Sequence, residues 1–184
     1  MGNFFFIDTH LDGLKIAKRN QVVDSRGYLS KIFCIDEMSS AGWVKSIAQI
    51  NHTYTKNKGT VRGFHYQHYP HAEMKLVSCI KGKILDIAID IRKDSPSFLQ
   101  WHSEILSEEN LSALLIPEGF AHGFQTLEDD CELMYLHSEK YKNLAEDGIR
   151  YNDPKLNMSW PLDVIEVSDR DQNHPLLTNK FLGI

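Results

Sequence analysis

Apolar and polar residues alternate along the middle of the chain. Over residues 84–92, Leu85, Ile87, Ile89 and Ile91 are separated by shorter or charged side chains. A period of two is typical of a β-strand with one buried face. The same alternation, together with residues that favour strands, predicts further strands over 61–67, 75–80, 101–106, 114–116 and 131–137.

Turn-forming residues separate these short strands. Lys81-Gly82-Lys83 predicts a hairpin between 75–80 and 84–92. Similar punctuation occurs at Asp94-Ser95-Pro96 and at Glu128-Asp129-Asp130. Many short strands joined by tight turns predict an all-β sandwich or barrel.

Helical signals are weak and the chain has no clear internal boundary. A short helix is predicted over 36–41, ended by Gly42, and a single helical turn over 107–110, capped by Ser107. Because no repeat, low-complexity tract or linker divides the chain, we expect one domain over 1–184. The tail after Pro154 has little periodicity and is expected to wrap the outside of the fold or pack on a partner subunit.

Composition narrows the class of protein. A chain of 184 residues with 42% hydrophobic residues is long enough to bury a core, and its formal charge of -5 argues against nucleic acid or anionic membranes as partners. The three cysteines contain no Cys-x-x-Cys pair and indicate reduced thiols. No apolar run is long enough for a signal-peptide core or a membrane span, so a soluble, cytoplasmic protein is expected.

The strand pattern also places candidate chemistry. His65 shares a strand face with Gly63 and Gln67, while Arg62 is expected on the opposite face. Lys75 and Tyr135 lie on the apolar faces of their own strands. If these faces line the interior, His65, Lys75 and Tyr135 converge where the dielectric is low and pKa values move, which would make a set of acids and bases.

Five sequence blocks then carry a family resemblance. They are Arg62-Gly63-Phe64-His65-Tyr66-Gln67, Lys75-Leu76-Val77, Asp86-Ile87-Ala88-Ile89-Asp90-Ile91-Arg92, Ile116-Pro117-Glu118-Gly119-Phe120-Ala121-His122-Gly123-Phe124 and Gly148-Ile149-Arg150-Tyr151-Asn152-Asp153-Pro154. In order and spacing, from about residue 13 to 177, the chain resembles the dTDP-4-dehydrorhamnose 3,5-epimerase family. The resemblance implies a cupin-type β-jelly roll with a few short helices, a homodimer, and no metal or organic cofactor.

The resemblance also implies a reaction. Such enzymes invert C3, C5 or both in a nucleotide-diphospho-4-keto-6-deoxy sugar, by removing a proton, forming an enolate and returning a proton from the opposite face. Such a reaction needs a base, an acid and a positive charge near the enolate oxygen. His65 matches the base, Asp171 the carboxylate that orients it, Lys75 the group that stabilises the enolate, and Tyr135 the acid.

Other matching positions are expected to bind the nucleotide-sugar substrate. They are Arg26 and Arg62 for the diphosphate, Gln49, Asn51 and Tyr141 for the nucleotide or diphosphate, and His122 in the pocket.

The chain departs from the family pattern at several positions. Leu29 stands where the family has an aromatic residue that stacks on thymine, so dTDP and GDP both stay open, as do a hexose or a heptose. Glu73-Met74 replaces the usual Gln-Gly, and His137-Ser138-Glu139-Lys140 replaces the usual Cys-Thr-Asp-Tyr.

Two other classes of function compete with this hypothesis. A metal-dependent cupin is suggested by Pro117-x-Gly119-x-x-His122, but His65-Tyr66-Gln67 lacks the second histidine, and Thr126 replaces an expected asparagine; Glu73 or His71 could compensate. A non-catalytic module that binds sugar nucleotides would not need opposed proton donors and acceptors. Five histidines are expected to be bystanders, namely His10, His52, His68, His102 and His174.

Overall fold

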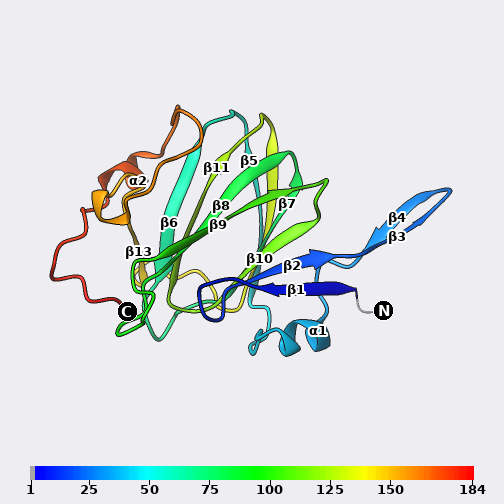
Figure 1. The fold of residues 1–184 in the computed structure, drawn as a ribbon, viewed down its shortest axis with the longest axis horizontal. Helices are drawn as coiled ribbons and strands as arrows, with labels where there is room; N and C mark the ends of the chain where they lie inside the picture. The colour runs from blue at the N-terminus through cyan, green and yellow to red at the C-terminus, as the bar shows by residue number, and fades with distance from the viewer. Residues whose placement is uncertain (1–2) are drawn as a thin grey trace.

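Two antiparallel sheets packed face to face form the body of the protein in this computed structural model, which describes residues 3–184 (Figure 1). The first sheet has six strands, in the order β1 (Phe4–Asp8), β2 (Lys15–Arg19), β10 (Ser112–Ile116), β7 (Lys75–Lys81), β12 (Cys131–His137) and β5 (Gln49–Thr55). The second has five, in the order β13 (Glu146–Gly148), β6 (Val61–Gln67), β11 (Phe120–Thr126), β8 (Lys83–Asp90) and β9 (Trp101–Ser107). The all-β jelly roll expected from the sequence is confirmed.

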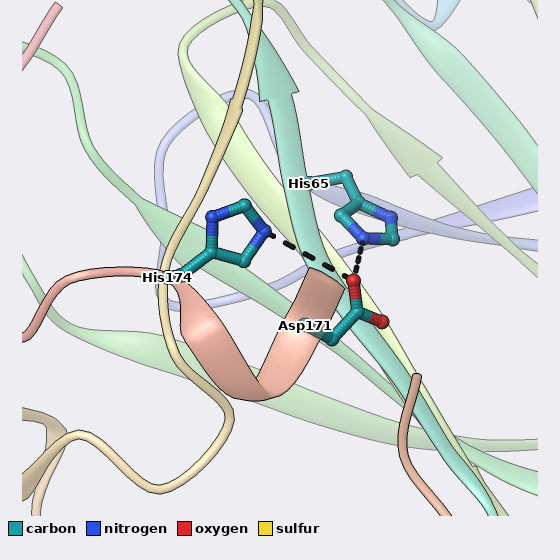
Figure 2. Close-up of side chains that lie close together, drawn as sticks. All are labelled: His65, Asp171 and His174. Carbon is teal, nitrogen blue, oxygen red and sulfur yellow. Dashed lines mark hydrogen bonds and ion pairs between the residues drawn. The ribbon is translucent and has the colours of Figure 1, made fainter. Parts of the chain in front are cut away.

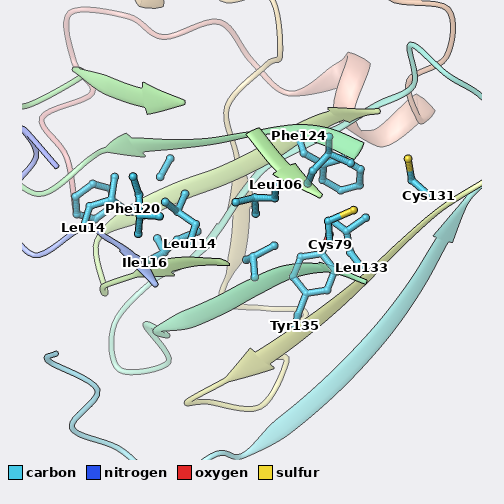
Figure 3. Packing of buried hydrophobic residues seen from close by; sticks show 14 of the residues in the cluster. Leu14, Cys79, Leu106, Leu114, Ile116, Phe120, Phe124, Cys131, Leu133 and Tyr135 are labelled. Atoms are coloured by element: carbon cyan, nitrogen blue, oxygen red, sulfur yellow. The ribbon is translucent and has the colours of Figure 1, made fainter. Parts of the chain in front are cut away.

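The main core fills the space between the two sheets (Figure 3). Val77 and Leu133 face it from the first sheet, and Leu106 and Phe124 face it from the second. Removing such side chains from water is the main favourable contribution to folding, at about 25 cal/mol per Å². This packing confirms the predictions that Lys75 and Tyr135 lie on inward faces, because Val77 and Leu133 share those faces.

The outer face of each sheet is covered as well. Trp43 and the short helix α1 (Ile35–Ser40) pack on the first sheet, which confirms the helix expected over 36–41. The tail after Pro154 packs Leu156 and Trp160 on the second sheet, and it contains the 3-10 turn η1 (Pro154–Leu156) and the helix α2 (Asp169–Asn173). Among the described residues, no helix has the length and apolar character that a membrane crossing requires.

The tail that packs on the second sheet buries the outer face of residues 84–92 as well. The expectation of a single buried face for this segment is therefore wrong. In β8, Ile87 and Ile89 point outward and are buried under the tail, while Asp86 and Ala88 point inward and are also buried. A strand buried on both faces places its polar residues in the interior, which the alternation alone does not reveal.

Two local predictions were wrong. Gly82 does not close a hairpin, because β7 and β8 belong to different sheets and the chain crosses between them. The residues at 107–110 form a turn instead of a helical turn, since Ser107 and Asn110 each bond the other's backbone N–H through a side-chain oxygen, both at 3.1 Å. Such side-chain bonds compete with helix formation.

A two-stranded arm, β3 (Gln21–Asp24) and β4 (Gly27–Ser30), projects from the side of the first sheet (Figure 1). Its apolar side chains are exposed, including Val23 and Leu29, each at 71%. An isolated hairpin is marginally stable in water. The arm therefore carries an apolar surface that the other described residues, within 3–184, do not cover.

Candidate active site

A pocket of about 230 Å³ opens between the two sheets. Eight of the ten residues predicted for the site line it: Gln49, Asn51, Arg62, His65, Lys75, His122, Tyr135 and Tyr141. They come from β5, β6, β7, β11 and β12, and from the loop after β12. The structure thus brings together His65, Lys75 and Tyr135, as their strand faces predicted.

An irregularity in β6 places Arg62 and His65 in the same pocket. His122 pairs with His65 and Phe124 pairs with Arg62, so β6 has one residue more than β11 between these pairs. Such a bulge changes which face a side chain occupies. The expectation that Arg62 lies on the face opposite His65 is therefore wrong.

Glycines make this close approach of β6 and β11 feasible. A Cβ atom on Gly63 would lie 2.5 Å from the Cα of Gly123, and one on Gly123 would lie 2.7 Å from Cδ1 of Phe64. Gly63 also has a φ of +121°, which L side chains rarely adopt. These contacts explain why glycine stands next to His122 and two residues before His65.

Asp171, on the short helix α2, lies beside the His65 ring (Figure 2). Its Oδ1 lies 2.7 Å from Nε2 of His65, and its Oδ2 accepts a hydrogen bond from the Gly63 N–H at 3.0 Å. Ser168 caps α2 by accepting from the Asp171 N–H, which fixes the helix that carries the carboxylate. Burial acts to raise the pKa of Asp171, but the hydrogen bond and charge of His65 outweigh it and lower the pKa.

This pair determines which nitrogen of His65 is free. Ionised Asp171 only accepts hydrogen bonds, so Nε2 of His65 carries the proton. A neutral His65 then has its lone pair on Nδ1, and its side chain is 31% exposed. His65 is therefore arranged to accept a proton through Nδ1.

Lys75 lies close to Glu73, on the same side of the pocket. Its Nζ is 3.2 Å from Oε1 of Glu73 and donates to the His65 carbonyl oxygen at 3.3 Å. Both side chains are largely buried. Burial acts to raise the pKa of Glu73, but Lys75 and His137 lower it on balance. The carboxylate thus holds the ammonium in a fixed place.

Tyr135 lies in a second histidine–carboxylate environment. Its ring contacts that of His122 at a centroid distance of 5.9 Å, and Nε2 of His122 lies 2.7 Å from Oδ1 of the fully buried Asp86. Burial and then the charge of Asp86 raise the pKa of Tyr135 well above its usual range. Tyr135 therefore keeps its proton at neutral pH and can donate it.

A chain of hydrogen bonds with one direction borders the pocket. The Tyr141 N–H donates to Oε1 of Gln49 at 3.1 Å, and Nε2 of Gln49 donates to Oδ1 of Asn51 at 3.0 Å. Nδ2 of Asn51 then faces Nε2 of His137 at 3.4 Å, and Nδ1 of His137 lies 2.8 Å from Glu73. Because a backbone N–H can only donate, the chain orients both amides and places the His137 proton on Nδ1.

Arg26 lies outside the pocket. It sits at the tip of the β3–β4 arm, where its side chain is 87% exposed and pairs with Asp24. Leu29, on the same arm, is also outside the pocket. The family resemblance identified Arg26 and Leu29 but did not indicate that they lie on an arm outside the pocket of the same chain.

Three residues in or next to the pocket were not predicted as catalytic or substrate-binding, although Glu73 was considered as a metal ligand and the sequence carried signals for all three. Glu73 and His137 line the pocket and lie two residues from Lys75 and Tyr135, on the same strand-face period. Asp86 interrupts an apolar strand on its inward face. These spacings would have placed all three at the site.

A metal-dependent cupin, the alternative suggested by the sequence, would need several ligand side chains around one ion. His65 is hydrogen-bonded to Asp171 and His122 to Asp86. The two histidines therefore do not share a carboxylate that could complete one metal site. In the described part of the chain, the one group of three side chains able to hold a metal ion is His65, Asp171 and His174. His174, expected to be a bystander, thus lies beside the histidine–carboxylate pair (Figure 2).

Comparisons with known proteins identify the family of the chain. The family model for dTDP-4-dehydrorhamnose 3,5-epimerase matches residues 8–179. An enzyme of that name from Salmonella typhimurium is 42% identical over 96% of this chain and 97% of its own length.

Solved structures show the same fold. A dTDP-6-deoxy-D-glucose-3,5-epimerase from Legionella pneumophila, in complex with dTDP-4-keto-L-rhamnose, has a TM-score of 0.89 and 36% identity over 94% of this chain and 92% of its own. A 3'-monoepimerase from Streptomyces bikiniensis, in complex with dTDP-quinovose, has a TM-score of 0.85 and 30% identity over 91% and 85%. Because the match in sequence and fold runs through nearly the whole chain, it belongs to the dTDP-4-dehydrorhamnose 3,5-epimerase family.

Proposed function

We propose that the protein epimerises a dTDP-linked 4-keto-6-deoxy sugar at C3, C5 or both. The observation that carries this proposal is that the two proton-transfer groups come from different sheets. His65 comes from β6 in one sheet, and Tyr135 comes from β12 in the other, so they form opposite walls of one pocket. Inversion needs removal of a proton from one face of the sugar and delivery to the other, which this arrangement supports.

Each catalytic step has a group in a suitable state. Nδ1 of His65 takes the proton from the carbon next to the C4 ketone, and the electron pair moves to the ketone oxygen to form the enolate. The Lys75 ammonium stabilises that oxygen, as charges placed in advance do for developing anions. Tyr135 then gives its proton to the opposite face of the carbon, and the carbonyl re-forms.

Nucleotide recognition is assigned to the polar residues around the pocket. Arg62 offers a guanidinium fork for the diphosphate, and Gln49, Asn51 and Tyr141 surround the opening. The relatives in complex with dTDP sugars favour thymidine over guanosine as the base. Leu29 is not in this pocket, so its departure from the family pattern does not alter the catalytic walls.

We also propose a homodimer in which the arm of each protomer reaches the pocket of its partner. The exposed apolar arm supports this assembly, as does β5, whose outer edge is unpaired in the first sheet. Gln49 and Asn51 on β5 line the pocket, so an arm docked along that edge would bring Arg26 to the opening. Arg26 would then serve the diphosphate across the dimer.

Deuterium exchange tests the reaction directly. The protein is incubated in D2O with dTDP-4-keto-6-deoxyglucose, or with the GDP-linked sugar, and deuterium at C3 and C5 is followed by proton NMR. We expect exchange with the dTDP sugar and inversion at each exchanging centre. Exchange with the GDP sugar alone would reassign the base, and no exchange by folded protein would favour a binding module.

The His65→Ala variant is the matched control. It should lose exchange at every centre yet bind dTDP nearly as the unaltered protein does in calorimetry, because the nucleotide contacts lie elsewhere. Exchange that persists in this variant would remove His65 from the mechanism.

A further inference from the structure

Three metal-binding atoms meet behind the pocket. Oδ1 of Asp171 lies 2.7 Å from Nε2 of His65 and 4.0 Å from Nε2 of His174, and all three atoms lie within 4.8 Å of one another (Figure 2). We propose that these side chains form a site for a transition-metal dication such as Zn²⁺, and that the bound ion inhibits proton transfer by His65.

His174 supplies an independent observation. Its side chain is only 11% exposed, and its Nε2 has no hydrogen-bond partner among the described residues, although it points at Asp171 (Figure 2). A buried imidazole nitrogen normally has a partner. Its backbone is fixed by Arg150, whose Nε donates to the His174 carbonyl oxygen at 2.7 Å.

The fold makes room for this imidazole. A Cβ on Gly148 would lie 2.3 Å from Nε2 of His174, so any side chain there would displace the ring. Gly148 pairs with His65 across β13 and β6, which places the open space beside the histidine–carboxylate pair. The site therefore rests on a glycine and an imidazole that fit each other.

The chemistry of the ligands suits zinc, cobalt or nickel. Two neutral imidazoles and a carboxylate are typical ligands for such ions and leave a fourth position for water. Oδ2 of Asp171 accepts the Gly63 N–H at 3.0 Å, which leaves Oδ1 directed at both imidazoles, 2.7 Å from Nε2 of His65 and 4.0 Å from Nε2 of His174. The nearby positive charge of Arg170 is balanced by Glu146, at 2.6 Å.

An ion has a route to the site. A second hollow, of about 280 Å³, is lined by His65 and Asp171 together with Ser168 and Glu166, and also by Arg62 and Arg170. It gives an ion access to His65 and Asp171 from the side of α2.

Binding would disable the base by moving one proton. Without a bound ion, Nε2 of His65 carries the proton and Nδ1 has the free lone pair. When Nε2 donates its lone pair to the metal, the single proton of the neutral ring sits on Nδ1, and no proton is released overall. His65 then has no lone pair for the substrate, an effect that rests on the proposed function.

The test uses Co²⁺ as a spectroscopic probe and Zn²⁺ as the inhibitor. Visible absorption of the metal-free protein is followed during Co²⁺ titration, and Zn²⁺ inhibition is measured by deuterium exchange. His174→Phe keeps a ring against His65 but removes the nitrogen, and His174→Ala serves if that variant fails to fold. His52→Phe is the matched control, because His52 pairs with Glu132 at 2.9 Å on the surface.

We expect one Co²⁺ per chain in the unaltered protein and in His52→Phe. In the His174 variant, affinity should fall at least about tenfold, since loss even of an outer partner of a metal ligand costs about 10- to 100-fold. The variant should keep its exchange activity and resist Zn²⁺, and EDTA should reverse inhibition of the unaltered protein. Mg²⁺ should have no effect, because it prefers oxygen ligands.

Two results would overturn the site. One is the absence of a Co²⁺ spectrum in the unaltered protein, and the other is equal Co²⁺ affinity or equal Zn²⁺ inhibition in the His174 variant. Co²⁺ binding does not depend on catalysis, so a protein that binds Co²⁺ through His174 but exchanges no substrate would keep the metal site and refute the proposed reaction.

Discussion

Nδ1 of His137 donates a hydrogen bond to Oε2 of Glu73 at 2.8 Å. The two residues lie at separate departures from the family pattern, 64 positions apart in the sequence, and the structure joins them. The residues that follow them are joined as well, since the Met74 N–H donates to Oγ of Ser138 at 2.7 Å. The departures therefore act as one coupled change beside Lys75.

This coupling predicts non-additive effects on stability. Glu73→Gln and His137→Cys, which restore the usual family residues, should each destabilise the fold. The first removes the carboxylate beside the buried Lys75 ammonium, and the second removes the hydrogen-bond donor to the buried Glu73. The double variant should be more stable than the sum of the single effects predicts, by about 1 kcal/mol or more. Urea unfolding of the four proteins measures this coupling, and strictly additive losses would contradict it.

Tyr135→Phe should separate the two proton transfers. The variant keeps His65, so deuterium should still enter recovered substrate from the face of the base. Inverted product should form about 100- to 10,000-fold more slowly, because the donor on the opposite face is missing. NMR of substrate and product distinguishes the two. Normal inversion by this variant would assign the acid to another group.

Mixed protomers test the position of Arg26. Arg26→Ala and His65→Ala should each be nearly inactive alone. If each arm serves the partner's pocket, a mixed dimer contains one intact site, and an equal mixture exchanged to equilibrium should recover about a quarter of the unaltered activity. No recovery, with mixed dimers confirmed by mass spectrometry, would show that Arg26 does not act across the dimer.

Gly123→Ala tests the close approach of β6 and β11. The added Cβ would lie 2.7 Å from Phe64 and 2.8 Å from the Arg62 carbonyl oxygen. We expect a loss of about 1–3 kcal/mol in the free energy of unfolding, typical of overpacking. Exchange activity per folded molecule should also fall, since the strand that holds His65 must move. Unchanged stability would show that the strands separate freely.

Asp90 should contribute stability that depends on pH. Burial acts to raise its pKa, but hydrogen bonds from Arg92, Ser95 and Ser97 lower it to about 2. A folded pKa below the unfolded value of 3.8 gives stability that is complete above about pH 4 and is lost as the pH falls towards 2.

The matching variant is Asp90→Asn. At pH 7 it should lose about 2 kcal/mol relative to the unaltered protein, from a shift of nearly two pKa units. The difference in urea unfolding should shrink as the pH falls below about 4. A difference that does not depend on pH would assign the loss to packing instead.

Several strands that were predicted from sequence have alternating apolar residues that face the core, although β11, with Phe120 and Phe124 in the core, was not predicted. In β12, Leu133 and Tyr135 share the inward face, and the same pattern placed Lys75 on β7. By contrast, β5 points polar Gln49 and Asn51 into the pocket and leaves Ile50 60% exposed. Hydrophobic alternation identifies a strand by its buried apolar side, so a strand that lines a polar pocket escapes it.

Other features depend on contacts between distant segments. The bulge that turns Arg62 into the pocket arises from pairing between β6 and β11. The tail was expected to wrap the outside or to pack on a partner subunit, without indication of which strand it buries. The space for the His174 ring is provided by Gly148 in β13. Local pattern carries no information about such encounters, although the family resemblance did place Asp171 beside His65.

Asp171 reaches His65 from 106 residues further along the chain, on a tail that also covers the second sheet. Folding intermediates that have assembled the sheets but not this tail would present an open pocket with an unoriented His65. Nucleotide binding would then report that the two sheets have folded, whereas turnover would report that the tail carrying Asp171 has also folded. Catalytic activity is thus the stricter criterion for a native chain.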